Sequence, residues 1–159
     1  MKATLLALAA FILSCSPLLA QDGLRSNNAA RYDSLLASRL GADAYGMKNY
    51  VMALLKAGPV KIQDSVQRDD LQRRHLKNIM RLAANGTLIL AGPFLDDQSL
   101  RGIFLFNVET VGEARAIAET DPAVRAGTLV LELHPWYGSA ALMEIPGIHK
   151  TIEKHSVAE

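Results

Sequence analysis

The order of apolar and amphipathic segments between Met47 and Tyr137 constrains the fold more than any other feature of this sequence. Short runs rich in leucine, isoleucine, valine and phenylalanine have the length of buried strands, and two longer segments have helical periodicity. The strand-like runs are centred on residues 50–55, 87–91, 101–108 and 128–133, and the helical segments span 69–85 and 110–120. The predicted order is therefore strand, helix, strand, strand, helix, strand, with a hairpin between the second and third strands.

Capping and turn residues agree with these boundaries. Thr110 and Glu113 have the spacing of a capping box, in which the two side chains satisfy backbone N–H groups at a helix start. Asp121-Pro122 ends the second helix, because the residue before a proline is disfavoured in helical geometry. Gly-Pro or Asn-Gly pairs end the other elements, at residues 58–59, 85–86 and 92–93.

This order predicts an α+β fold of the ferredoxin-like β-α-β-β-α-β type, a four-stranded antiparallel sheet with two helices on one face. The strands are apolar along nearly their whole length, as expected of a sheet that is covered on both faces. With both helices on one face, the other face needs a second cover. A second copy of the chain would supply it, so we expect a homodimer.

The first twenty residues have the pattern of a secretory signal peptide. An apolar run from Ala3 to Leu13 follows the positive charge of Lys2, and it is too short to span a bilayer. Cleavage after Ala20 competes with a lipoprotein box that would lipidate Cys15. Leu13 is large for its place in that box, so cleavage after Ala20 is favoured. We expect an exported protein, periplasmic or secreted, with a lipid anchor at Cys15 as the alternative and no membrane span.

The cysteine count and the charge balance argue against a disulfide-stabilised protein and against a nucleic-acid-binding protein. Cys15 is the only cysteine, so cleavage at residue 20 leaves neither disulfides nor thiol chemistry. The 17 basic and 16 acidic residues balance, without the basic stripe of a nucleic-acid-binding protein.

Residues 21–46 are expected to form an N-terminal extension with a short helix, Tyr32–Leu40, closed by Gly41. The domain itself spans residues 47–137. Residues 138–159 form a C-terminal tail with little periodicity.

The first predicted helix carries a candidate functional residue, His75. At about 100° per residue it lies on the same arc as Leu71, Ile79 and Leu82, on the apolar side of the helix. A buried imidazole needs a partner, since an unpaired buried polar group costs about 1–3 kcal/mol. Taken alone, the pattern favours a core histidine bonded to a backbone carbonyl over a functional one.

Asp121 is a candidate partner for this imidazole. In the predicted fold the two helices lie antiparallel, so the end of the second helix approaches the N-terminal half of the first, where His75 lies. A carboxylate beside an imidazole fixes its tautomer and raises its basicity, as a general acid or base requires. The alternative is that Asp121 holds only the backbone of residues 123–124.

Four short motifs together resemble the YCII-related family. They are Arg74-His75-Leu76, Gly92-Pro93-Phe94, Glu113-Ala114 and Asp121-Pro122, within a region from about Met47 to Trp136. The resemblance implies a dimeric α/β barrel with a pocket between helix, sheet and second protomer. It places His75 and Asp121 in that pocket and Gly92-Pro93 beside it, where the glycine lets a ligand approach the backbone. It implies no particular reaction.

His134 and Trp136 belong to an aromatic cluster that follows the last predicted strand. They are candidates to bind a ligand, although edge packing or a dimer contact is favoured. With His75 and Asp121, His134 also makes up the residue types of a two-histidine, one-carboxylate metal site. Nothing in the sequence places the three together, and we expect neither a metal nor an organic cofactor.

Two functions remain open. The first is an enzyme of lyase, isomerase or hydrolase type that acts on a small organic molecule outside the cytoplasm. Its general acid/base would be His75, oriented by Asp121. The substrate-binding residues would be Gly92, Pro93, His134 and Trp136. The alternative, slightly less favoured, is a non-catalytic domain that binds a small ligand or acts through its dimer surface.

Overall fold

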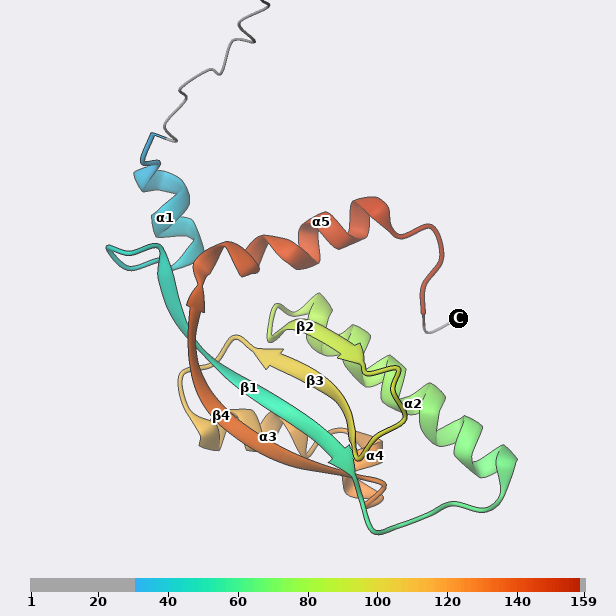
Figure 1. The fold of residues 1–159 in the computed structure, drawn as a ribbon. Coiled ribbons are helices and arrows are strands. Elements are labelled where there is room, and N and C mark those ends of the chain that lie inside the picture. Colours follow the sequence, from blue (N-terminus) through green and yellow to red (C-terminus); the bar gives the residue numbers. More distant parts are fainter. Residues whose placement is uncertain (1–30, 158–159) are drawn as a thin grey trace, which may run out of the picture. The chain divides into compact units, whose positions relative to one another are not determined.

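Within residues 31–157, which the computed structural model describes, four strands form one antiparallel sheet in the order β2-β3-β1-β4 (Figure 1). The strands are β1 (Met47–Ala57), β2 (Leu88–Pro93), β3 (Leu100–Phe106) and β4 (Leu129–Ser139). The long central strand β1 pairs with β3 along one edge and with β4 along the other. The predicted signal segment, including Cys15, lies outside the described residues.

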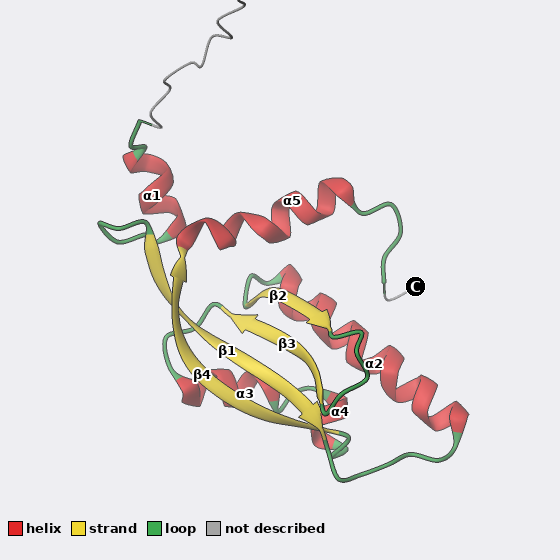
Figure 2. Cartoon of the chain, in the orientation of Figure 1, coloured by secondary structure: helices red, strands yellow, loops and turns green. Residues whose placement is uncertain are grey.

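Helices connect the strands in the predicted order, and further helices precede β1 and follow β4 (Figure 2). They are α1 (Ser34–Leu40), α2 (Ser65–Ala84), α3 (Val111–Ala118), α4 (Pro122–Arg125), the 3-10 helix η1 (Ala140–Glu144) and α5 (Ile145–Ile152). The β1-α2-β2-β3-α3-β4 order and the strand pairing confirm the α+β, ferredoxin-like fold. The helices within residues 31–157 are too short or too polar to cross a membrane.

The helix ends follow the local sequence signals. The Thr110–Glu113 capping box is present at the start of α3, as predicted. Gly41 closes α1 in the left-handed conformation, at φ 68°, which glycine adopts at little cost. Asp64 accepts a hydrogen bond from the Gln67 amide at 2.8 Å, so α2 begins one turn before the predicted helix.

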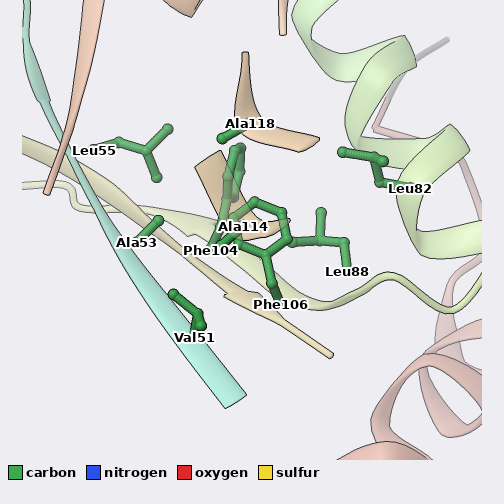
Figure 3. Packing of buried hydrophobic residues seen from close by; sticks show 9 residues of the cluster. All are labelled: Val51, Ala53, Leu55, Leu82, Leu88, Phe104, Phe106, Ala114 and Ala118. Atoms are coloured by element: carbon green, nitrogen blue, oxygen red, sulfur yellow. The ribbon is translucent and has the colours of Figure 1, made fainter. Parts of the chain in front are cut away.

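The main hydrophobic core lies between the sheet and the helices α2 and α3 (Figure 3). Its buried members are Val51, Ala53, Leu55, Leu82, Leu88, Phe104, Phe106, Ala114 and Ala118. The Phe104 and Phe106 rings meet edge to face, with centroids 5.7 Å apart. Alternate residues of β1 and β3 thus point to the same side of the sheet, where both helices bury them.

The opposite face has a smaller core around Tyr50, Ile89 and Leu105. Leu142 and Met143 of η1 pack against it, and α5 lies beside β2 (Figure 1). Part of this face is therefore covered by the chain's own C-terminal segment.

The sequence pattern did not predict these C-terminal helices. Pro146 and Gly147 stand in the first turn of α5, where proline is tolerated but glycine lowers helix propensity. The remaining eight-residue segment is too short to show a clear period. The cover of this face is incomplete, since Val130 is 41% and Trp136 36% exposed.

Candidate functional site

His75 and Asp121 are in direct contact. Nδ1 of His75 lies 2.9 Å from Oδ1 and 2.8 Å from Oδ2 of Asp121. The Asp121 side chain is fully buried, and 12% of the His75 side chain is exposed. Because an ionised carboxylate only accepts hydrogen bonds, Nδ1 carries the hydrogen. The neutral imidazole therefore has its lone pair on Nε2.

Separate elements of the fold bring the two residues together. His75 lies near the middle of α2, and its ring stacks on Phe104 of β3 with centroids 6.1 Å apart and planes 24° apart. Asp121 lies between α3 and α4 and caps α4, since its Oδ1 accepts from the Ala123 amide at 2.8 Å. The carboxylate thus holds both the backbone of the following turn and the imidazole, the two roles that the sequence left as alternatives.

A cavity of about 810 Å³ lies beside His75, a volume typical of sites for small organic molecules. Within residues 31–157, Nε2 of His75 makes no hydrogen bond, yet every buried side-chain nitrogen or oxygen there has a partner. Nε2 is therefore accessible, and the surface that His75 presents is the cavity. Apolar side chains supply most of the lining, including Leu55, Leu71, Ile79, Phe104 and Leu129.

Gly92 and Pro93 line the same cavity. A Cβ placed on Gly92 would meet no atom within 4 Å, so the space beside its backbone is free for a ligand. The structure thus brings His75 and the Gly92-Pro93 turn to one cavity, with Asp121 behind the imidazole.

Comparison with known proteins identifies the domain. The YCII-related domain matches residues 50–137. The chain belongs to the YCII-related family. Among solved structures it is similar to 5-chloro-2-hydroxyhydroquinone dehydrochlorinase (TftG) from Burkholderia phenoliruptrix AC1100, in complex with 2,5-dihydroxybenzoquinone. That similarity has 24% identity and a TM-score of 0.40, and it covers 56% of this chain and 93% of the other. A comparison with curated proteins gives no match.

In this YCII-related domain Asn78 supports the His75–Asp121 pair. Its Nδ2 donates to Oδ2 of Asp121 at 3.2 Å. Its Oδ1 accepts from Arg81 at 2.8 Å. The Thr120 hydroxyl lies 3.4 Å from the same Oδ1 but donates its hydrogen to the Ile117 carbonyl at 2.7 Å. The sequence interpretation missed Asn78, although a signal was present: an asparagine one helical turn after His75, on the apolar side of the helix.

His134 and Trp136 lie on the opposite face of the sheet from His75. Leu131 and Leu133 pack against the helix-side core, and side chains alternate along a strand. The predicted strand ended at residue 133, but β4 continues to Ser139, so the alternation extends through both residues. Neither lines the cavity.

His134 therefore does not join His75 and Asp121 in one cluster. Residues 31–157 contain no group of three or more histidine, cysteine or acidic side chains suited to a metal ion. On its own face, Nε2 of His134 lies 2.9 Å from Oε1 of Glu132. Lys56, which also bonds Glu132, together with His134 holds the pKa of the Glu132 carboxyl below its ordinary value.

Trp136 packs beside Tyr50, with ring centroids 5.9 Å apart. The Tyr50 hydroxyl donates to the Ser139 carbonyl at 3.1 Å, and burial raises the pKa of this phenol. This arrangement belongs to the packing of the second face of the YCII-related domain.

Proposed function

We propose that this YCII-related protein is an enzyme that transfers protons within a small organic substrate, with His75 as general acid and base. One observation carries the proposal. A fully buried carboxylate, Asp121, binds Nδ1 of His75, while Nε2 of the same ring is accessible at a largely apolar cavity. A histidine that served only the core would have both ring nitrogens satisfied by the protein.

The geometry supports a simple sequence of proton transfers. Neutral His75 takes a proton from the substrate at Nε2, and the electron pair of the broken bond stays with the substrate. The imidazolium that forms is stabilised by Asp121, whose negative charge acts strongly in an apolar site of low dielectric. His75 then returns the proton to another atom of the substrate or to a leaving group. Isomerases and lyases use this sequence.

Replacement of His75 tests the catalytic role. With a substrate found by screening small organic molecules, His75→Ala is expected to lower kcat by about 10²–10⁴-fold, the usual contribution of a general acid or base. His149→Ala is the matched control, because His149 is a 59% exposed histidine on α5 and should leave turnover unchanged. Turnover retained in His75→Ala would contradict the proposal and favour the non-catalytic ligand-binding alternative.

The Asp121→Asn variant tests the orientation of the ring without a substrate. An amide keeps an acceptor for the Ala123 N–H but presents a donor to His75, so the ring hydrogen is expected to move from Nδ1 to Nε2. Side-chain ¹⁵N NMR distinguishes the two tautomers. An unchanged Nδ1–H tautomer in Asp121→Asn would show that Asp121 does not control the ring.

We also propose that the protein is exported and acts as a homodimer. The signal pattern of residues 1–20 supports export. On the second sheet face the apolar side chains of Val130 and Trp136 remain partly exposed, and a second copy would cover them. Mass spectrometry of the N-terminus after cell fractionation tests export. An unprocessed chain in the cytoplasmic fraction would contradict it, and a lipid on Cys15 would select the anchored form.

A further inference from the structure

The charged side chains that line the cavity beside His75 are all positive. Among the described residues that line it, three carry full charges, Lys61, Arg68 and Arg101, and none is acidic. The chain as a whole has 17 basic and 16 acidic residues, so the imbalance is local. The carboxylate of Asp121 is buried behind the His75 ring and does not line the cavity.

Arg68 is the best placed of these cations. It precedes His75 by seven residues, two turns of α2, so both lie on one face of the helix and about 10 Å apart along its axis. Leu71 and Gln72, which lie between them, also line the cavity. An anionic group at Arg68 and a reacting atom at Nε2 therefore fit the two ends of one small molecule.

The positive charge of Arg68 is not neutralised by a salt bridge. Within residues 31–157 neither Arg68 nor Lys61 forms an ion pair, whereas Arg101 pairs with Asp97 at 2.5 Å. Three acids lie near Arg68 in the sequence. Asp69 follows it directly, and because successive residues of a helix point about 100° apart, it lies on a different face of α2. Asp64 caps α2, and Asp70 pairs with the neighbouring Arg73 and Arg74 at 2.5 and 2.9 Å. The guanidinium thus remains available to an external anion.

We infer that the cavity binds a small carboxylic acid with an apolar or aromatic body. Arg68 binds the carboxylate, and Lys61, on the loop before α2, adds a second positive charge. The apolar body lies along Leu71 and Phe104, which brings the opposite end of the molecule to Nε2 of His75. This inference rests on the proposed function for the reaction at Nε2, and it adds the substrate class. An arginine suits the role because its planar fork matches a carboxylate.

Binding of a matched pair of probes tests this class. Phenylacetate and its neutral analogue phenylacetamide have nearly the same shape and differ in charge. Ligand-observed NMR with the full chain, as processed by the expressing cell, is expected to show tighter binding of phenylacetate. Arg68→Gln is expected to weaken phenylacetate binding roughly tenfold or more, since hydrogen bonds to charged groups contribute strongly. Phenylacetamide binding should stay within about twofold of the wild-type value.

Lys77→Gln is the matched control. Lys77 is an exposed cation on the same helix that does not line the cavity, so its removal lowers the net charge equally and should not change binding. Thermal melting of both variants verifies that they are folded. Equal binding of acid and amide, binding of neither in the millimolar range, or equal effects of Arg68→Gln and Lys77→Gln would overturn the inference.

The same assay separates this inference from the proposed catalytic role. His75→Ala is expected to retain the preference for phenylacetate over phenylacetamide, because Arg68 is intact. If that variant also retains turnover of the true substrate, the acid/base role fails while the carboxylate site stands. If turnover is lost and the wild type has no preference for the acid, the substrate class fails and the acid/base role stands.

Discussion

The two faces of the sheet each carry a histidine beside a carboxylate, but the two pairs differ in their surroundings. On the helix-covered face, Asp121 is fully buried and His75 is 12% exposed. On the other face, the side chains of His134 and Glu132 are 51% and 44% exposed. Water competes for the second pair and leaves the first undisturbed, so only the His75 ring is held in one orientation. A histidine beside a carboxylate therefore occurs on both faces, and the burial of Asp121 is what distinguishes the candidate site.

An aspartate introduced on each face should give the largest difference in the free energy of unfolding between the two faces. Ala53 on the helix-covered face is fully buried, so Ala53→Asp buries an unpaired charge and should lower the free energy of unfolding by at least about 3 kcal/mol. Val130 is 41% exposed in the single chain, so Val130→Asp should lower the free energy of unfolding of the monomer by about 1 kcal/mol or less. Chemical denaturation measures both values.

The same Val130→Asp protein tests the proposed homodimer. A charge placed in a sheet-to-sheet contact should convert dimers to monomers in light scattering coupled to size exclusion, while Val130→Thr should not. A wild-type protein that is already monomeric would contradict the dimer. An equal loss of stability in Ala53→Asp and Val130→Asp would contradict the difference between the two faces.

Removal of a polar side chain from each face gives a smaller contrast. Asn78 is 8% exposed and bridges Asp121 to Arg81. Asn78→Ala should therefore lower the free energy of unfolding by about 1–3 kcal/mol, because buried partners are left unpaired. His134→Ala on the open face should change it by no more than about 0.5 kcal/mol. Thermal and chemical denaturation measure the stability of both variants. Comparable losses of stability in Asn78→Ala and His134→Ala would contradict the difference in burial.

The smallest expected effect is the dependence of stability on pH at Glu132. Lys56 and His134 hold its pKa below the ordinary value, so the folded state favours the ionised carboxylate. The stabilisation is present above about pH 4 and is lost as the pH falls through the lowered pKa. Glu132→Gln should therefore lower Tm slightly at neutral pH and leave it unchanged in acid. A Tm difference that grows in acid would contradict this sign.

The fold was largely predictable because its signals are local. Alternating strand and helix periods, the Thr110–Glu113 capping box and Gly41 each specify their own segment. The C-terminal helices were not predicted, since the η1 residues Leu142 and Met143 are stabilised by packing on a cluster of residues distant in the sequence, which includes Tyr50. Such long-range packing leaves only a weak pattern in a short segment.

The site was predictable in part for the same reason. Helix geometry placed His75 on the buried side, and the fold brought Asp121 to it. Helix geometry also places Asn78 on the buried side, but its partner Asp121 is 43 residues away, and no local pattern reveals that contact. The placement of His134 required the true end of β4, six residues beyond the predicted one. Strand ends are set by pairing with β1, through which Met47 meets Ser139, rather than by the composition of the strand itself.

The two hydrogen-bonded roles of Asp121 limit which amino acids can replace it. Asparagine can still cap α4 but reverses the hydrogen bond to the imidazole, and glutamate is too long to cap the helix from the same backbone position. Position 121 is thus constrained by folding as well as by chemistry. A relative with aspartate at this position but no histidine opposite it would still fold, as a domain that has kept its architecture and lost its acid/base pair.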